Sequence, residues 1–285
     1  MTLLIEDVLK SFQERVEIAL KRKIELLGEK NHLREACGFA LLNGGKRLRP
    51  LITLMVAEAL GKNQDVMDAA LACEMFHCAS LVADDLPCMD NDATRRGKPS
   101  THVVYGEALS LLVTYGLISA GYGCLAENVT KMKQGVFAER ADHVGMLSLE
   151  NVTYNTGLMG ATGGQFLDIA PPDLTLATID RVIHQKTVSL FEISFVNGWL
   201  FGGGDLDKID LIKKLASHFG RAFQIVDDID DGDQDGGQGV NIAVLLGAEK
   251  ASKMALEELD QYQKLLVKLN IDTSLGKLPQ ILNLH

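Results

Sequence analysis

Apolar residues recur every three or four positions through most of the chain, and this repeat constrains the fold more than any other feature. It is clear in residues 5–27, where Ile5, Val8, Phe12 and Val16 begin a single helical stripe. No segment shows sustained alternation joined by hairpin turns, so no β-sheet is expected. The sequence predicts an all-α fold. The same helical repeat returns at about residues 38–60, 66–86, 108–126, 144–170, 179–201, 209–229 and 248–269.

The composition is that of a soluble, helical protein. Only six prolines interrupt the 285 residues, and no linker rich in proline, glycine or serine separates the helical segments. The 28 lysines and arginines against 38 aspartates and glutamates give a net charge of −10, which offers little electrostatic help to nucleic-acid binding. We therefore expect one domain over residues 1–285 and no nucleic-acid partner.

We expect a cytoplasmic protein without a membrane span. The five cysteines are odd in number and lack C-x-x-C spacing, which is typical of reduced thiols. The N-terminus becomes acidic at Glu6 and lacks the basic and apolar blocks of a signal peptide. Residues 108–126 carry no charge and approach the roughly 20 residues that span a bilayer. Their serines, tyrosines and glycines instead favour a helix buried on most sides within a soluble protein.

Aspartates form two clusters, each directly after an apolar segment that is expected to be helical. Clustered carboxylates repel one another unless they share a positive charge, so two such clusters favour bound cations over solvated helix ends. Magnesium prefers oxygen ligands and commonly binds through one or two carboxylates plus a substrate phosphate. The clusters therefore predict magnesium binding. The first contains Asp84, Asp85, Asp90 and Asp92, and the second contains Asp227, Asp228 and Asp231.

The spacing within each cluster predicts its local geometry. Asp227 and Asp231 are four residues apart and share a helix face, with Gln224 close beside them. Asp84 and Asp90 are six apart, so Pro87 must bend or end the helix before both can reach one metal cluster.

A calcium-binding loop is an alternative for the second cluster. Asp231, Asp233, Asp235 and Gly236 match the opening of an EF-hand loop. The twelfth position, however, is Ile242, where a bidentate glutamate belongs. Magnesium is therefore the favoured cation.

Basic side chains accompany the acidic clusters in this net-acidic chain. Arginine forks suit bidentate phosphate contacts, while a lysine acts as a compact charge. His77 lies two turns before Asp84 on the same helix face. The basic residues are Lys46, Arg47 and Arg49 in GGKRLRP and Arg95 and Arg96 in ATRRGKP.

The order and spacing of five motifs resemble the trans-isoprenyl diphosphate synthases, the farnesyl and geranylgeranyl diphosphate synthase family. These motifs are GGKRLRP, DDLPCMDNDATRRGKP, GGQ at 163–165, HQKT at 184–187 and FQIVDDIDD, and they cover about residues 35–250. The resemblance implies a single-domain bundle of long helices around a deep apolar cavity, usually as a homodimer. It also implies head-to-tail condensation of isopentenyl diphosphate with dimethylallyl, geranyl or farnesyl diphosphate, with release of diphosphate.

The resemblance also implies roles for individual residues. About three Mg²⁺ ions per active site would hold the allylic diphosphate, and a dry, positively charged site would favour its departure. The implied metal ligands are Asp84, Asp85, Asp90, Asp227, Asp228 and Asp231. The implied allylic site contains Arg95, Lys186 and Thr187, with Gln224 near the reacting carbons. The expected catalytic residues are Lys186, Thr187 and Gln224. The implied isopentenyl diphosphate site contains Lys46, Arg49, His77 and Arg96.

Product length is expected to depend on side chains one and two turns before Asp84. The residue five before it is Ala79, where an aromatic residue would stop growth at fifteen carbons. The residue eight before it is Phe76, which could close the cavity about 5.4 Å, one helical turn, deeper. Geranylgeranyl diphosphate, with twenty carbons, is the expected product, and farnesyl diphosphate is the alternative.

Three departures from the family pattern keep other functions open. Val188 and Ser189 follow HQKT where the family usually has glycine, and the loop after the second cluster reads GGQGVN without its usual lysine. Thr114 and Tyr115 stand where the family has Gly-Asp, which makes Tyr115 an alternative cavity floor. A non-catalytic subunit that modulates an active synthase therefore stays an alternative. A terpene cyclase is disfavoured because it would not need GGKRLRP for a second diphosphate.

Overall fold

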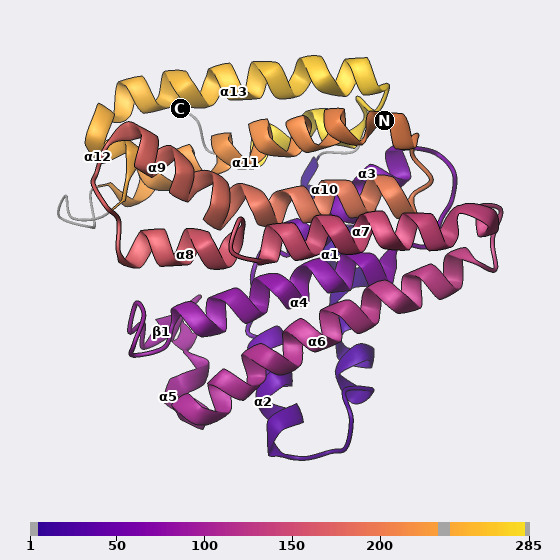
Figure 1. The fold of residues 1–285 in the computed structure, drawn as a ribbon, viewed down its shortest axis with the longest axis horizontal. Coiled ribbons are helices and arrows are strands. Elements are labelled where there is room, and N and C mark those ends of the chain that lie inside the picture. The colour runs from indigo at the N-terminus through magenta and orange to yellow at the C-terminus, as the bar shows by residue number, and fades with distance from the viewer. Residues whose placement is uncertain (1–4, 233–239, 283–285) are drawn as a thin grey trace. The chain divides into compact units, whose positions relative to one another are not determined.

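The computed structural model describes residues 5–232 and 240–282. These residues are mostly helical, which confirms the prediction of an all-α fold (Figure 1). They divide into two compact units, each described by itself below. Unit 1 comprises Met1–Leu54 and Gln64–Leu149, and unit 2 comprises Met55–Asn63 and Glu150–His285. The expectation of one domain over residues 1–285 stays a prediction.

Unit 1 is built around the pairing of α4 with α6, which run side by side in Figure 1. Helix α4 buries most of its residues because apolar residues lie around most of its circumference. The helices of unit 1 are α1 (Ile5–Glu25), α2 (His32–Leu41), α4 (Met67–Asp84), α5 (Thr101–Tyr105), α6 (Glu107–Met132) and the 3₁₀ helix η1 (Ala138–Arg140). Helices α3 (Leu48–Ala59) and α7 (Ala141–Thr156) contribute to both units.

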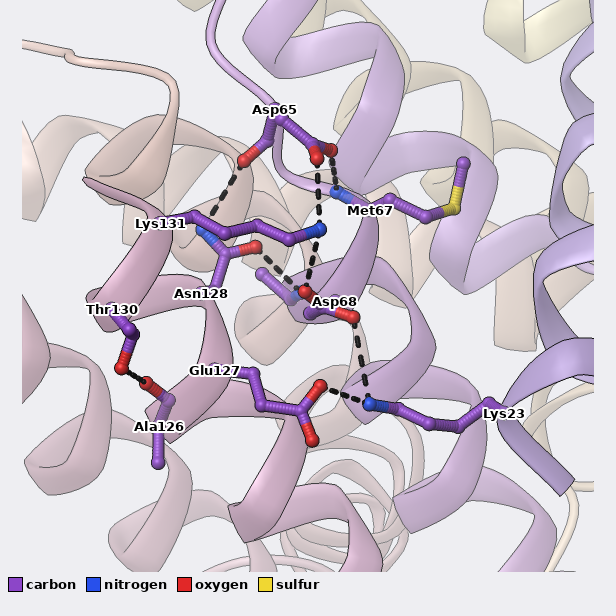
Figure 2. Close-up of polar contacts among 10 residues, drawn as sticks. Lys23, Asp65, Met67, Asp68, Ala126, Glu127, Asn128, Thr130 and Lys131 are labelled. Carbon is purple, nitrogen blue, oxygen red and sulfur yellow. Dashed lines mark hydrogen bonds and ion pairs between the residues drawn. The ribbon is translucent and has the colours of Figure 1, made fainter. Parts of the chain in front are cut away.

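A polar cluster joins α1, α4 and α6 near the start of α4 (Figure 2). The Nζ of Lys23 lies 3.6 Å from Oδ1 of Asp68 and also pairs with Glu127. The Nζ of Lys131 lies 2.8 Å from Oδ2 of Asp65 and 2.8 Å from Oδ2 of Asp68. Lys23 and Asp68 are buried, and each also pairs with a second charged residue, so removing either would weaken a connected network of charges. The cluster therefore fixes how the three helices meet.

Unit 2 is centred on α10, every residue of which is buried. It packs against α11, and α11 packs along α13 (Figure 1). Phe191, Phe195, Phe219 and Tyr262 form the aromatic core between these helices. Its helices are α8 (Ala161–Ile169), α9 (Leu176–Val182), π-helix η2 (Ile183–Val188), α10 (Ser189–Phe201), η3 (Leu206–Lys208), α11 (Ile209–Asp231), α12 (Ile242–Leu246), α13 (Ala248–Leu269) and η4 (Ser274–Ile281).

Glycines divide two of the predicted helical segments. Segment 38–60 separates into α2 and α3 around Gly44 and Gly45, whose φ angles of +93° and +116° end a right-handed helix. Segment 144–170 separates into α7 and α8 at residues 157–160. In each case both helices bury apolar faces, so the three-four repeat of apolar residues continues across the break and does not reveal it.

The expectation of no β-sheet needs one correction. Strand β1 (Thr94–Arg95) pairs antiparallel with β2 (Lys98–Pro99) in a small hairpin. Arg96 and Gly97 have φ angles of +57° and +73°, which is the left-handed conformation of a tight two-residue hairpin turn. Strands of two residues are too short to produce a detectable alternation of apolar residues.

Helix α6 is buried on one side only, not on most sides as expected. It is long and apolar enough to cross a membrane, although only 39% of its most apolar 18-residue stretch is buried. Length and composition are weak grounds for a span, because core helices of soluble proteins share them. Its exposed apolar side chains are Leu111, Leu112, Tyr115 and Ile118.

Candidate active site

In unit 1, the GGKRLRP segment forms a turn against the β1–β2 hairpin. Arg96 donates a hydrogen bond to the carbonyl oxygen of Gly44. A Cβ at Gly45 would collide with the guanidinium of Arg96, so a larger residue there would displace that guanidinium. The structure thereby brings together two basic motifs that lie 52 residues apart. Lys46, in the same turn, is exposed.

Arg49 and His77 meet beside this turn, with 3.2 Å between Nη1 and Nε2. Burial lowers the pKa of His77 well below its usual value, and the charges of Arg49, Arg96, Arg47 and Arg95 lower it further. Within the described part of the chain, Nδ1 of His77 has no hydrogen-bond partner. A neutral imidazole that lies among positive charges and has one ring nitrogen without a hydrogen-bond partner fits an anion-binding site.

Arg47 anchors the turn from inside. Its Nε lies 2.6 Å from Oε1 of Glu17, its Nη1 lies 2.6 Å from Oε1 of Glu74, and its Nη2 donates to the carbonyl of Leu41 at 2.6 Å. Arg47 and Glu74 are both buried. Its anchoring role could not be predicted from the sequence, because its partners lie far away in the chain. Its contacts make it an anchor that presents the neighbouring cations.

The first aspartate cluster lies where α4 ends. The helix stops at Asp84, as expected from Pro87, and the chain turns back so that the N–H of Asp90 donates to the carbonyl of Asp84 at 2.9 Å. Asp84 and Asp85 are buried, and Asp90 is exposed. The turn therefore returns the third aspartate to the end of the helix that carries the first two.

Arg95 bridges this cluster. Its Nε donates to Oδ1 of Asp85 at 2.8 Å, and its Nη2 donates to Oδ2 of Asp92 at 2.8 Å. A pocket nearby is lined in part by Asn43, Asp85, Arg95 and Arg96. A fixed arginine beside buried carboxylates provides both the charge for a phosphate and the oxygens for a cation.

In unit 2, the HQKT motif lies in the π-helix η2, a distortion that occurs frequently at functional sites. The Nζ of Lys186 lies 2.6 Å from Oδ2 of Asp168 on α8. A Cβ at Gly164 would collide with the backbone of Lys186, which explains why the GGQ motif packs so closely on η2. Asp168 was not singled out from the sequence, because no local pattern links it to Lys186.

Gln165 is the other residue of this region without a predicted role. Both polar atoms of its side-chain amide are buried and lack a hydrogen-bond partner among the residues the structure describes. A buried amide left unsatisfied costs about 1–3 kcal/mol, so a ligand that bonds to it would recover that free energy.

A chain of hydrogen bonds links the expected catalytic residues to the second cluster. The hydroxyl of Thr187 donates to Oε1 of Gln224 at 2.6 Å, and Nε2 of Gln224 donates to Oδ1 of Asp228 at 2.7 Å. The N–H of Ile242 donates to Oδ2 of the same aspartate at 2.8 Å. These bonds fix the orientation of all three polar side chains.

The electrostatics of the second cluster fit a cation. Burial raises the pKa of Asp228 to about 6, and Asp227 and Asp231 add to the rise, while hydrogen bonds from Gln224 and Ile242 oppose it. The repulsion among these carboxylates is what a divalent cation would relieve. Across the described residues, no group of three or more His, Cys, Asp or Glu side chains is arranged to hold a metal ion. Residues 233–239, which contain most of the calcium-loop alternative and the lysine-free loop, lie outside the described residues.

The predicted chain-length residues lie on α4. Phe76 and Ala79 are both buried, and the ring of Phe76 contacts the ring of Tyr122 on α6 edge-on, with 5.2 Å between centroids. Tyr115, the alternative floor, is 59% exposed. Val188, which follows HQKT in place of the usual glycine, is fully buried against α11, where a Cβ at Gly220 would lie 3.1 Å from its Cα.

Comparison with known proteins agrees with these observations. Residues 30–263 match the family described as polyprenyl synthetase. The chain is 37% identical to a farnesyl diphosphate synthase of Geobacillus stearothermophilus over 80% of its own length and 75% of that protein. It is 36% identical to a chloroplastic geranylgeranyl pyrophosphate synthase of Capsicum annuum over 81% of its own length and 65% of that protein.

Solved structures show the same fold. An FPP/GFPP synthase from Zymomonas mobilis superimposes with a TM-score of 0.83 at 30% identity, covering 98% of this chain and 99% of that one. A geranyltranstransferase from Thermotoga maritima gives a TM-score of 0.78 at 29% identity, covering 96% and 97% of the two chains. The helical fold, the aspartate clusters and the sequence match agree, and the chain belongs to the polyprenyl synthetase family of prenyltransferases.

Proposed function

We propose that this protein condenses isopentenyl diphosphate with an allylic diphosphate in a Mg²⁺-dependent reaction and releases geranylgeranyl diphosphate as its main product. The observation that carries the proposal is that each unit combines carboxylates with cations that suit a diphosphate. Unit 1 holds Arg49, His77 and Arg96 in a positive field and also carries Asp84 and Asp85 with Arg95. Unit 2 holds Lys186 beside the Thr187–Gln224–Asp228 chain. The reaction needs two diphosphate sites.

The proposed roles follow from charge and position. Magnesium, when bound, neutralises the charge of the departing diphosphate. Arg95, Lys186 and Thr187 bind allylic phosphate oxygens, while Gln224 lies near the reacting carbons. The proposed metal ligands are Asp84, Asp85, Asp90, Asp227, Asp228 and Asp231. The proposed isopentenyl diphosphate ligands are Lys46, Arg49, His77 and Arg96.

The bond changes are balanced without a side-chain nucleophile. The allylic C–O bond breaks, and its electron pair leaves with the diphosphate. The double bond of isopentenyl diphosphate forms the new C–C bond, and a proton then leaves to the released diphosphate. The protein supplies electrostatic stabilisation and excludes water, which would otherwise capture the allylic cation.

Twenty carbons are proposed because Ala79, one turn before Asp84, has a small side chain, and the large ring of Phe76 lies one turn farther from Asp84 on α4. Both side chains are buried, and their three-residue spacing places them on the same face of α4. Farnesyl diphosphate is the alternative product, and it would place the floor nearer Asp84.

We also propose a cytoplasmic homodimer. Helices α5 and α6 expose an apolar surface that a second copy would cover, since contiguous apolar patches of this kind mark interaction sites. Light scattering on the purified protein tests the dimer, and replacement of Leu112 by glutamate is expected to weaken it. The members of this exposed set are Val103, Val104, Leu111, Leu112, Tyr115 and Ile118.

The decisive experiment incubates the purified protein with Mg²⁺, labelled isopentenyl diphosphate and each allylic starter, and identifies products after dephosphorylation. A twenty-carbon product that disappears with a chelator supports the proposal, whereas fifteen carbons selects the farnesyl alternative. No product with any starter favours the non-catalytic subunit. Asp84→Asn is expected to abolish turnover, and Asp142→Asn, on the exposed side of α7, is expected to retain it.

A further inference from the structure

Phe76 does not lie against a smooth helix surface but in a notch of α6. A Cβ at Gly121 would lie 2.8 Å from both Cε1 and Cζ of Phe76, closer than real Cβ atoms approach a neighbour. The Phe76 ring therefore occupies the space that any other residue at position 121 would need. Tyr122, the next residue on α6, contacts the same ring edge-on at an interplanar angle of 67°.

The backbone gives no other reason for glycine at this position. Gly121 lies within α6, where glycine costs about 1 kcal/mol relative to alanine. The three nearest heavy atoms to its added Cβ all belong to the Phe76 ring. The other glycines of α6 differ, because Gly116 makes only an ordinary contact at 3.7 Å and Gly123 has nothing within 4 Å. Close approach of the Phe76 ring is the feature that distinguishes Gly121.

We propose that Gly121 and Tyr122 are specificity-determining residues that set product length by holding the ring of Phe76. This inference rests on the proposed function, in which Phe76 closes the end of the cavity. Gly121 lets the ring sit back into α6, and Tyr122 holds it there. The two residues then act in opposite directions, because a side chain at position 121 drives the ring out of the notch while loss of the Tyr122 ring frees it to swing aside.

The test compares product lengths of matched variants. Gly121→Ala is expected to lower the ratio of twenty-carbon to fifteen-carbon product about tenfold, since overpacking displaces the ring. Tyr122→Ala is expected to add products longer than those of the wild type. Gly123→Ala, on the same helix but facing open space, is the control and should leave the product distribution unchanged.

Coupling to Phe76 separates positioning from a general effect on folding. In a Phe76→Leu background the clash is absent, so Gly121→Ala should no longer change product length, and the double variant should be folded by circular dichroism even where the single variant is not. If Gly121→Ala shifts product length equally in the Phe76→Leu and wild-type backgrounds, or shifts it in neither, the inference is wrong. A wild-type enzyme that forms no condensation product would instead refute the proposed function.

Discussion

The ammonium of Lys186 and the carboxylate of Asp168 lie 2.6 Å apart, although the residues are 18 positions apart in the chain. Both side chains are partly exposed, so the ion pair contributes modestly to the stability of the fold. Its main role is to fix the direction of the flexible Lys186 side chain. Asp168→Asn is therefore expected to lower kcat/KM for the allylic diphosphate about 10- to 100-fold while KM for isopentenyl diphosphate changes little. Steady-state kinetics measures both. An unchanged kcat/KM would mean that Lys186 does not depend on Asp168.

The two glycines of the basic turn provide a matched comparison. Gly44 and Gly45 both have positive φ, so alanine strains the backbone at either position. Only at position 45 does the added Cβ meet Arg96. We expect Gly45→Ala to raise KM for isopentenyl diphosphate about tenfold, and Gly44→Ala to raise it much less. Equal effects of the two substitutions would show that backbone strain alone matters.

Arg47 is expected to dominate the stability of this turn. Arg47→Met leaves the buried carboxylate of Glu74 without its partner, which should lower the free energy of unfolding by about 3–5 kcal/mol in chemical denaturation. Replacing Glu74 by methionine in the same chain should recover part of the loss. Lys133→Met, which breaks an exposed ion pair with Asp142, is the control and should cost less than about 1 kcal/mol. A small loss for Arg47→Met would show that the buried pair is not required.

Ala79→Tyr tests the direction of chain growth. Ala79 is 1% exposed on α4, one turn closer to Asp84 than Phe76. A tyrosine there is expected to shorten the main product from twenty carbons to fifteen, because it fills the space that the growing chain would enter. Product analysis after dephosphorylation is the measurement. An unchanged length with retained activity would place the floor elsewhere.

Local sequence patterns predicted much of this structure. They did not predict contacts between residues that are far apart in the sequence. The apolar repeat located the helices, and Pro87 correctly placed the end of α4 because its effect is confined to its own turn. The β1–β2 hairpin was missed because its strands are too short to form a pattern.

The same distinction applies within the candidate site. The motifs indicated which side chains carry charge, but not which partner holds each one. Glu74 on Arg47, Asp168 on Lys186 and Tyr122 on Phe76 come from separate elements, and only the folded chain brings each pair together. Such partners are ordinary residue types, so nothing in their own neighbourhood distinguishes them.

Asp228 predicts a measurable pH dependence. Its pKa is raised from 3.8 to about 6, with burial as the largest cause. Between these pH values the folded chain keeps a proton that the unfolded chain has lost, so this group lowers the stability of the metal-free protein as pH rises from about 4 to about 6. Above pH 6 the full cost is present. Asp228→Asn removes the charge. In chemical denaturation, its free energy of unfolding should therefore exceed that of the metal-free wild type by an amount that grows through this pH range to at most about 3 kcal/mol.

Magnesium should favour the wild type over the Asp228→Asn variant. A cation bound near Asp228 favours the ionised carboxylate, so Mg²⁺ is expected to raise the melting temperature of the wild type at pH 7.5 and to do so less at pH 5, where binding must displace a proton. The Asp228→Asn variant, more stable without metal, should gain less from Mg²⁺ and lose most of its activity. Asp230→Asn, on the exposed side of the same helix, should behave like the wild type in both conditions. A Mg²⁺ effect that is the same at both pH values would mean that Asp228 is not a ligand, because a metal-bound carboxylate has to lose its proton first.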